Sequence, residues 1–394
     1  YGAIRRIFAI TPANATGVTA DLTLTYYDGA LNSERGALDP ANLVLYRCNN
    51  GVWQSPDAAY TTGAAGSYRS VTLPGYTFDG FGLFALGAPP SRNADLIDLV
   101  LNGATVTPAL TPAFAPAVFE YTTTVAADVF TVTATPTLSD TTASVWVNGV
   151  PVTSGSPSGP IDLAIGATII TTTVTAEDGL TTRTYTVTVT RPPNCMATPD
   201  DGATAFASYD ASAVQQAADV APAGATVKVA GDCRGVQTRG GETQTLTISQ
   251  TLTVEGGYSF TDWTVSYPIT QPTTLDAQSG GRVIYATAPV TVANLTMQNG
   301  NGSVFGGGIY AVQALALSNV QAISNTAASG GGAFGNASVT VSGGRFENNI
   351  ASGDGGGLRA VGAATVTGAT FVGNTAATAG GALFDSGSTV ANTN

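Results

Sequence analysis

The sequence predicts an all-β protein: two antiparallel β-sandwich domains, followed by a right-handed parallel β-helix that begins with one capping helix. Three observations predict this class. Strand-forming residues such as Val, Thr, Tyr and Phe recur between turn residues along almost the whole chain, which contains 48 glycines. Two proline-containing linkers divide the chain into three parts. A repeat of 24 or 25 residues runs through the last part.

Length and charge limit the possible functions. A chain of 394 residues favours two to four domains. With 26 acidic and 14 basic residues the net charge is −12, which argues against nucleic acid or anionic lipid as partners. No apolar run reaches the roughly 18 residues that a membrane span needs. The sequence starts at Tyr1 without a signal peptide, so we expect a processed or partial product.

Residues 1–88 are expected to form the first sandwich. Strand-like runs alternate with turns there: TADLTLTYYDG, NLVLYRCNNGVWQ, SYRSVTLPG and FGLFALG. The segment GAPPSRN, from Gly87 to Asn93, follows as a linker. Adjacent prolines cannot continue a ladder of backbone hydrogen bonds, and they favour an extended spacer.

Residues 94–191 are expected to form the second sandwich. The runs VFEYTTTV, VFTVTATP, ASVWVNG, ATIITTTVTAEDG and TTRTYTVTVTR alternate with a period of two, which turns one face of each strand inward. Glu177 and Asp178 lie in AEDG, whose glycine predicts a polar hairpin turn.

This second segment as a whole resembles the cadherin-like β-sandwich domain common in bacterial surface proteins. The matching features are the opening ADLIDLVLNGATVTPALTPAFAPAVFEYTTTV, the turn WVNGVPV and the closing AEDGLTTRTYTVTVTR. Such domains serve as spacers or binding modules. The resemblance therefore implies neither catalysis nor a calcium site.

The third part, residues 195–394, follows the linker RPPN and starts with a predicted helix in SYDASAVQQAADVAPAGATV. Asp210 is expected to cap this helix, and Pro222 with Gly224 to end it. One face collects Val214, Ala217, Ala218 and Ala221. We expect that face to cover the exposed end of the sheet that follows.

The cysteines are Cys48, Cys195 and Cys233. In an extracellular setting we expect a disulfide between Cys195 and Cys233, with Cys48 free or paired with another molecule. The alternative is three unpaired thiols. Zinc is not expected, because the chain has no histidine and no CxxC spacing.

Glycine clusters mark the repeat of the third part. They read GGGIY, GGGAF, GGGLR and GGALF, and they begin at Gly306, Gly330, Gly355 and Gly380. Asparagines follow the same period at Asn325, Asn349 and Asn374. Phe346 and Phe371 precede the last two asparagines by three residues, in FENN and FVGN.

A unit of this length cannot bury its own faces and must stack on its neighbours. Three short strands and three turns fill about 25 residues, which suits one coil of a parallel β-helix. Glycine at the recurring corner permits positive φ and close approach between coils. Aligned asparagines can pass hydrogen bonds from coil to coil, while aligned phenylalanines stack in the interior.

The pair GGA[ILV] and FxxN resembles the repeats of the chlamydial polymorphic outer membrane proteins, which form right-handed β-helices on cell surfaces. GGALF and both FxxN sequences fit this pattern, whereas three clusters have Gly in place of Ala, and Ala322 replaces Phe in one coil. The stretch from CMATPDDGATAFASYDASAVQQAADV to GGYSFTDWTVSYPITQPTTLDAQ also looks like the capped start of bacterial surface β-helices.

A carbohydrate-active β-helix enzyme is an alternative, because this fold also hosts polysaccharide lyases and galacturonases. Their sites need two or more carboxylates that converge from adjacent coils. No aligned position of the repeat holds a carboxylate twice, and Asp354 with Arg359 fits a surface ion pair better than a catalytic pair. Without histidine, serine and cysteine nucleophiles lack their usual base. We expect no catalytic residue, cofactor or metal.

Two binding alternatives are weaker. Trp53, Tyr60, Tyr258 and Trp263 could stack on sugar rings, although single aromatic residues in β-domains more often pack in the core or at an edge. The turn PDDG at 199–202 and the scattered Asp28, Asp57 and Asp79 could supply oxygen ligands to calcium. None of these has a calcium-loop spacing, and solvated turns explain them better.

Taken together, these features predict a structural or adhesive protein that lies outside the cell or on its surface, as an adhesin, a stalk or a filament subunit without catalytic activity. The expected partners are other protein chains, including copies of itself in fibres, or cell-surface glycans. The alternatives are the carbohydrate-active enzyme and a glycan-binding module.

Overall fold

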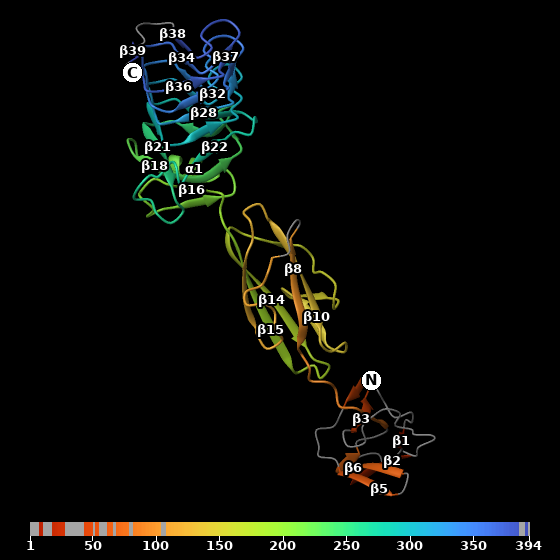
Figure 1. Ribbon diagram of the computed structural model, residues 1–394. Helices are drawn as coiled ribbons and strands as arrows, with labels where there is room; N and C mark the ends of the chain where they lie inside the picture. The colour runs from red at the N-terminus through yellow and green to blue at the C-terminus, as the bar shows by residue number, and fades with distance from the viewer. Residues whose placement is uncertain are drawn as a thin grey trace. The chain divides into compact units, whose positions relative to one another are not determined.

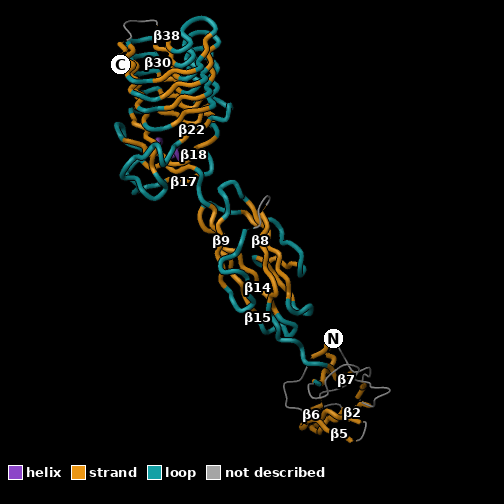
Figure 2. The backbone as a smooth tube through the Cα atoms, in the orientation of Figure 1, coloured by secondary structure: helices purple, strands orange, loops and turns teal. Residues whose placement is uncertain are grey.

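The predicted fold class is confirmed by a computed structural model, which describes residues 8–10, 18–27, 43–49, 52–54, 61–65, 68–78, 82–103, 108–385 and 391–392. The described residues are almost entirely strands and turns, with a single α-helix, α1 (Ser212–Val220) (Figure 1). Figure 2 shows the strands in orange and this helix in purple. Among these residues no helix has the length and apolarity to cross a membrane.

The first part of the chain forms two antiparallel sheets. One has the order β1-β7-β3-β4 and the other β2-β6-β5. Their strands are β1 (Phe8–Ile10), β2 (Val18–Tyr27), β3 (Val44–Asn49), β4 (Val52–Gln54), β5 (Thr61–Ala65), β6 (Tyr68–Phe78) and β7 (Gly82–Gly87). Along β2, Leu22, Leu24 and Tyr26 are buried while the residues between them are exposed. This alternation is the one expected of a sheet with one covered face.

The middle part has a three-stranded sheet, β13-β10-β8, and a five-stranded sheet, β12-β11-β14-β15-β9. Their strands are β8 (Leu96–Gly103), β9 (Glu120–Thr124), β10 (Thr131–Leu138), β11 (Ser144–Val147), β12 (Val150–Val152), β13 (Ile161–Asp162), β14 (Gly166–Thr175) and β15 (Thr182–Arg191). Every second residue of β10 is buried, as the sequence pattern predicts.

One strand pair of this middle part corrects the expected antiparallel arrangement. β9 and β15 run in the same direction, with Glu120 opposite Thr186. A parallel pair needs a long crossover, because the chain must return to the same end of the sheet before it re-enters. Here the chain leaves β9 for β10 in the other sheet and comes back to β15 only after β14.

The turn before β15 is the polar hairpin turn expected at Glu177 and Asp178. The Asp178 carboxylate accepts hydrogen bonds from the N–H groups of Leu180 and Thr181 and from the Thr181 hydroxyl. Glu177 Oε2 accepts a hydrogen bond from Ser91 N at 2.7 Å. Both carboxylates therefore accept hydrogen bonds from backbone N–H groups.

The third part is a parallel β-solenoid of about six turns. Three strand columns continue from coil to coil, and a short fourth column joins them in the later coils (Figures 1 and 2). The first column is β18 (Thr226–Arg234), β21 (Leu252–Tyr258), β24 (Val290–Ala293), β27 (Leu315–Ser318), β31 (Val339–Ser342), β35 (Ala364–Thr367) and β39 (Ala391–Asn392). The second is β22 (Thr274–Asp276), β25 (Thr296–Gln298), β28 (Gln321–Ile323), β32 (Arg345–Glu347) and β36 (Thr370–Val372).

The remaining columns close each coil. The third column is β20 (Glu242–Ile248), β23 (Arg282–Ala286), β26 (Ile309–Ala311), β30 (Ala333–Gly335), β34 (Leu358–Ala360) and β38 (Leu383–Asp385), with β19 (Gln237–Arg239) at its edge. The short column is β29 (Thr326–Ala327), β33 (Ile350–Ala351) and β37 (Thr375–Ala376). One continuous core of Val, Leu, Ile and Ala side chains fills the space that the columns enclose.

Helix α1 caps the first coil, as expected. Val214 and Ala217 are fully buried against the core, and Gln215 is only 2% exposed. The Gln215 side chain donates to Thr247 O at 3.0 Å and accepts from Thr247 N at 2.8 Å. The helix thereby satisfies backbone groups of β20, which has no solenoid coil before it.

The start of α1 differs slightly from the expectation. Ala211 occupies the N-cap position and makes no side-chain cap bond, whereas Asp210 lies one residue earlier. Asp210 Oδ1 still accepts a hydrogen bond from Ser212 N at 2.9 Å. The aspartate therefore closes a local turn that leads into the helix, because its side chain reaches two residues ahead.

Cys195 and Cys233 form a disulfide, as predicted. It joins β16 (Cys195–Thr198) to β18, next to the short strand β17 (Phe206–Ser208). Both cysteines are fully buried in the core of the capped end. Cys48, in β3, is free among the described residues.

Candidate functional site

The first glycines of the four clusters lie at one corner of the solenoid. Their φ angles are +56° at Gly306, +66° at Gly330, +67° at Gly355 and +66° at Gly380. Backbone bonds connect the coils at this corner: Gly330 N donates to Asp354 O at 3.0 Å and Gly355 N to Ala379 O at 2.9 Å. Glycine adopts such angles at no steric cost, and a Cβ atom would lie 2.1 Å from Ile309 O at Gly306 and 2.4 Å from Ala333 O at Gly330, so the corner requires glycine.

The later glycines of each cluster are required by crowding. A Cβ atom at Gly332 would lie 2.4 Å from Gly357 O and 3.1 Å from the Asn349 side chain. At Gly308 it would lie 2.2 Å from Gly332 O. The glycine clusters and the asparagines therefore pack against each other, although they are far apart in the repeat.

The three asparagines form a hydrogen-bonded ladder inside the solenoid. Asn325 Nδ2 donates to Asn349 Oδ1 at 3.0 Å, and Asn349 Nδ2 donates to Asn374 Oδ1 at 2.8 Å. The Asn325 and Asn349 backbone N–H groups donate to the same two oxygens, each at 3.0 Å. Asn325 and Asn349 have no exposed surface, so their side-chain amides form hydrogen bonds only inside the solenoid.

The two phenylalanines stack directly. The rings of Phe346 and Phe371 have centroids 4.8 Å apart and planes inclined by 12°. In the preceding coils Ala322 and Met297 occupy the same column. The column thus stays apolar from coil to coil while the side-chain volume varies.

The outer face of the third column carries a ridge of aromatic and arginine side chains, which we call the aromatic ridge. Its members are the fifth residues of the clusters and their neighbours: Arg282, Tyr285, Phe305, Tyr310, Phe334, Arg359 and Phe384. Tyr285 and Tyr310 stack with centroids 5.5 Å apart, and Phe305 packs 4.4 Å from Phe334. Burial among these groups raises the pKa of the Tyr310 phenol.

Two arginines, Arg282 and Arg359, pack over the rings of the aromatic ridge in different coils. Arg282 is nearly buried, and its guanidinium donates to the carbonyls of Phe305 and Gly306 while it lies over the Tyr285 and Tyr310 rings. Such a cation over aromatic faces is favourable where water is excluded. The ridge was not predicted from the sequence, although the last letters of GGGIY, GGGAF, GGGLR and GGALF contain its signal.

Asp354 and Arg359 meet in this ridge. Arg359 Nη1 lies 3.2 Å from Asp354 Oδ2 and 2.6 Å from Ser329 Oγ, and each side chain of the ion pair is 22% exposed. The guanidinium also lies between the Phe334 and Phe384 rings, at 5.6 and 5.4 Å. The geometry is that of an ion pair held by packing, and in the described coils on either side Ser329 and Ala379 stand at the position of Asp354.

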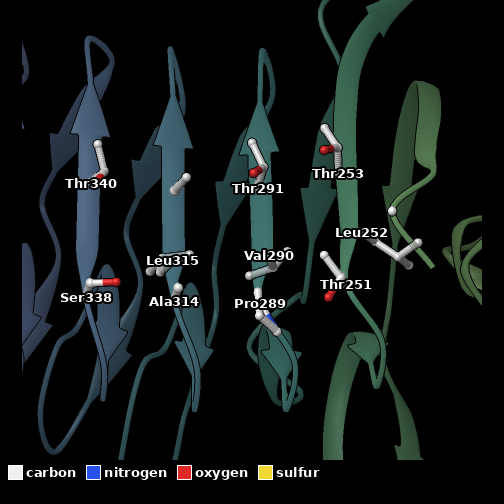
Figure 3. A pocket seen from close by; sticks show the side chains of 12 residues that line it. Thr251, Leu252, Thr253, Pro289, Val290, Thr291, Ala314, Leu315, Ser338 and Thr340 are labelled. Carbon is white, nitrogen blue, oxygen red and sulfur yellow. The ribbon is translucent and has the colours of Figure 1, made fainter.

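The outer face of the first column has a shallow groove of about 200 Å³. Figure 3 shows Thr253, Thr291 and Thr340 in one row across neighbouring strands, with Thr251 and Ser338 in a second row. None of the lining side chains titrates. The groove therefore offers hydroxyl groups and small apolar surfaces but no acid or base.

A second, larger cavity of about 330 Å³ lies beside the loop that connects β21 to β22. Its lining residues are Pro268, Ile269, Pro272, Thr273, Asn294, Leu295, Thr296, Asn319 and Gln321. The loop supplies the proline-rich wall, and the two following coils supply the amide side chains. No local sequence signal reveals this cavity, because residues more than 20 positions apart form it.

Two of the aromatic residues considered for sugar stacking, Tyr258 and Trp263, do not lie on a free surface. Tyr258 and Trp263 are 4% and 7% exposed and pack on each other with centroids 5.9 Å apart. Burial, followed by the hydrogen bond to Glu255, raises the pKa of the Tyr258 phenol. Trp53 belongs to β4, and Tyr60 lies outside the described residues.

The acidic turn at 199–202 holds its own backbone. Asp200 Oδ1 accepts from Thr204 N at 2.7 Å and from Thr198 Oγ1 at 2.9 Å, and Asp201 pairs with Lys228 at 2.6 Å. Asp28, Asp57 and Asp79 lie outside the described residues. Within the part of the chain that the structure describes, no cluster of three or more acidic, histidine or cysteine side chains could hold a metal ion.

Residues 96–192 match the model of the cadherin-like β-sandwich domain. A protein of Evansella cellulosilytica named "Putative membrane protein" is 39% identical over 101 residues, which are 26% of this chain and 14% of that protein. The chain thus spans only a small share of this relative. No solved structure matches the chain. The middle part of the chain is therefore a cadherin-like β-sandwich domain, and a β-solenoid follows it.

Proposed function

We propose that this is an extracellular, non-catalytic protein of the cell surface, in which the solenoid serves as a rigid stalk or filament segment and as a platform for adhesion. A cadherin-like domain suggests a cell-surface or adhesion-type role, and a buried disulfide is typical of proteins outside the cell. The expected partners are other protein chains or cell-surface glycans.

The observation that carries this proposal is that the repeated side chains make their contacts inside the solenoid, with neighbouring coils. Asn325 and Asn349 use their amides on the neighbouring coil, and Phe346 uses its ring on Phe371. Residues repeated for catalysis would instead converge on an accessible cleft. A stack in which each coil covers the next is rigid, because bending it separates packed coils.

The solenoid repeat is, in this proposal, of the polymorphic outer membrane protein type. The support is GGALF at Gly380 and the FENN and FVGN sequences at Phe346 and Phe371. Gly332 and Gly357 stand where the GGA[ILV] pattern has alanine, and Ala382 holds that position in the last cluster.

Three measurements test the proposal. Beads coated with the purified chain should bind to cells or to each other, and electron microscopy should show rod-like particles or fibres. Incubation with polygalacturonate and other acidic glycans should release no reducing ends or unsaturated products. Turnover that Asp354→Ala abolishes would replace this proposal with the carbohydrate-active enzyme. Beads that bind neither cells nor one another would remove the adhesive part of it.

A further inference from the structure

The cavity beside the β21–β22 loop has the features of a built binding site. Its loop wall is anchored before any ligand binds: Tyr267 N donates to Gly257 O at 2.6 Å, and Ser266 Oγ donates to Gly256 O at 2.7 Å. Gly257 N in turn donates to Thr273 Oγ1 at 2.9 Å. A site that is already ordered loses little conformational entropy when a ligand binds, so less of the binding free energy is offset.

Two glycines allow the loop to lie this close to the solenoid. Gly257 has a φ of +91°, and a Cβ atom there would lie 2.4 Å from Ser266 Oγ and 2.9 Å from Pro268 N. At Gly256 a Cβ atom would lie 2.7 Å from Asn294 O. The sequence GGY at the end of β21 is thus required by the loop that forms the cavity wall.

The two coils that follow the loop line the cavity with oriented amides. Asn319 Nδ2 donates to Asn294 Oδ1 at 3.0 Å, and Asn294 Nδ2 donates to Glu255 Oε1 at 3.0 Å. This chain of bonds fixes the orientation of both side chains. Gln321 is exposed and lines the cavity, so its amide can both donate and accept hydrogen bonds.

The lining residues determine which charge and which surface a ligand must have. None of the nine lining residues is charged, so the cavity offers an ionic group no partner. Pro268, Ile269 and Pro272 give the lining its apolar surface, and the Ile269 side chain is 93% exposed, so it can contact a ligand. A ligand that matches these lining residues is neutral and carries both apolar surface and hydroxyl groups.

We infer that this cavity binds a neutral saccharide of one or two pyranose rings. A volume of about 330 Å³ lies at the small end of the range for ligand sites, which suits one or two sugar rings. A peptide fits less well, because it would add to a strand edge and the neighbouring backbone is already paired. Thr296 N donates to Thr273 O at 2.9 Å and Gln321 N to Leu295 O at 3.0 Å.

This inference deepens the proposed function, since it names the class of glycan on which adhesion would rest. Binding is measured by titration calorimetry on the full chain with cellobiose, maltose, lactose and chitobiose, and with digalacturonate and N-acetyl-triglycine amide as charged and peptide counterparts. We expect at least one neutral disaccharide to bind in the micromolar to millimolar range. Gln321→Ala and Asn319→Ala should each weaken that binding at least tenfold.

Thr340→Ala, on the separate groove of the first column, is the matched control and should leave the affinity unchanged. Gln321 and Thr340 are exposed, so their variants should keep the circular dichroism spectrum of the parent chain. Asn319 has a φ of +51°, so Asn319→Ala is compared with Asn319→Gly, which adopts this angle without strain. The inference is overturned if no neutral disaccharide binds, if digalacturonate or the peptide binds equally well, or if neither cavity variant weakens binding. Adhesion of the beads without sugar binding would reject this site and leave the proposed function standing.

Discussion

The side-chain amide of Asn325 donates to the side-chain oxygen of Asn349, 24 residues later, and both residues are completely buried. Asn349 repeats the arrangement with Asn374 in the following coil. Buried amides of this kind are costly unless every donor and acceptor is paired. The ladder therefore fixes the register of the coils as well as joining them.

Asn349→Ala should destabilise the solenoid by about 2–4 kcal/mol. The change removes bonds to Asn374 Oδ1 and to Ala322 O, and it leaves the Asn325 amide without its acceptor. The measurement is the free energy of unfolding from urea denaturation. Asn336→Ala is the control, because Asn336 is exposed, and it should change that free energy by less than about 0.5 kcal/mol. Equal effects of the two changes would show that the ladder does not stabilise the fold.

The sequence predicted this ladder because its residues recur at a constant spacing. The 24- and 25-residue separations place Asn325, Asn349 and Asn374 in one column, and a column of like side chains can only contact itself. The preceding coil could not be predicted this way. Gly300 stands in the asparagine position there, because a Cβ atom would lie 1.9 Å from Gly307 O, and it uses its own N–H to bond Asn325 Oδ1.

Contacts between segments that share no repeated motif could not be predicted from the spacing of residues in the sequence. The cavity beside the β21–β22 loop needs the loop at Pro268 and the corner at Asn319 to meet, and neither contains a motif by itself. The aromatic ridge was missed for another reason: tyrosine, phenylalanine and arginine share its positions, so their common role is visible only when the rings and guanidinium groups stack. The parallel pairing of β9 and β15 likewise depends on the path between two sheets.

Phe346→Ala should lower the free energy of unfolding by about 3–5 kcal/mol. Phe346 has no exposed surface, and its removal leaves a cavity beside Phe371. Val372→Ala in the neighbouring strand β36 is the control, since Val372 is 41% exposed and should cost less than about 1 kcal/mol. A loss below 1 kcal/mol for Phe346→Ala would mean that the column collapses to fill the space, as the coil with Ala322 already does.

Gln215→Ala should loosen the capped end of the solenoid by about 1–3 kcal/mol. The side chain is buried and is the partner of both backbone groups of Thr247, so its loss leaves an N–H and a carbonyl of β20 unpaired. The neighbouring helix residue provides a matched control, because Gln216 is exposed and Gln216→Ala keeps the helix.

Hydrogen exchange is the suitable readout for this cap. Amides of β20 and β23 should exchange faster in Gln215→Ala than in Gln216→Ala, while amides of β34 should be unchanged. Because an uncovered strand edge pairs readily with another chain, Gln215→Ala should also increase self-association at high concentration. Uniformly faster exchange in all coils would instead indicate that the solenoid unfolds as one unit.

Removing the disulfide with Cys195→Ala and Cys233→Ala together should cost about 3–4 kcal/mol. The bond closes a loop of 38 residues. A closed loop of this size lowers the conformational entropy of the unfolded chain, and this loss of entropy sets the expected value. Denaturation of the double variant, and of the parent chain with a reducing agent, should give similar midpoints. Cys48→Ala serves as the control, because Cys48 is free among the described residues. A midpoint that falls only for Cys48→Ala would contradict the assigned pairing.

Stability should be independent of pH between about pH 6 and 8 and should fall on acidification below about pH 4. The chain has no histidine, so none of its side chains has an ordinary pKa in the neutral range. The Thr181 hydroxyl, followed by backbone N–H groups, lowers the pKa of Asp178. The Thr204 backbone N–H lowers the pKa of Asp200, and Arg345 lowers that of Glu347.

The sign follows from linkage. A carboxyl group whose folded pKa lies below its unfolded value stabilises the fold at any pH above the unfolded value, and that contribution disappears as the pH falls through the folded value. Denaturation midpoints are best compared at pH 7, 5, 4 and 3 in 0.5 M salt, which screens the repulsion from a net charge of −12. Asp178→Asn should show a smaller drop between pH 5 and 3 than the parent chain, because the asparagine amide cannot lose a charge. If stability instead rises as the pH falls from 5 to 3, the relief of charge repulsion outweighs the stabilisation that the hydrogen-bonded carboxylates supply. That result would contradict their role.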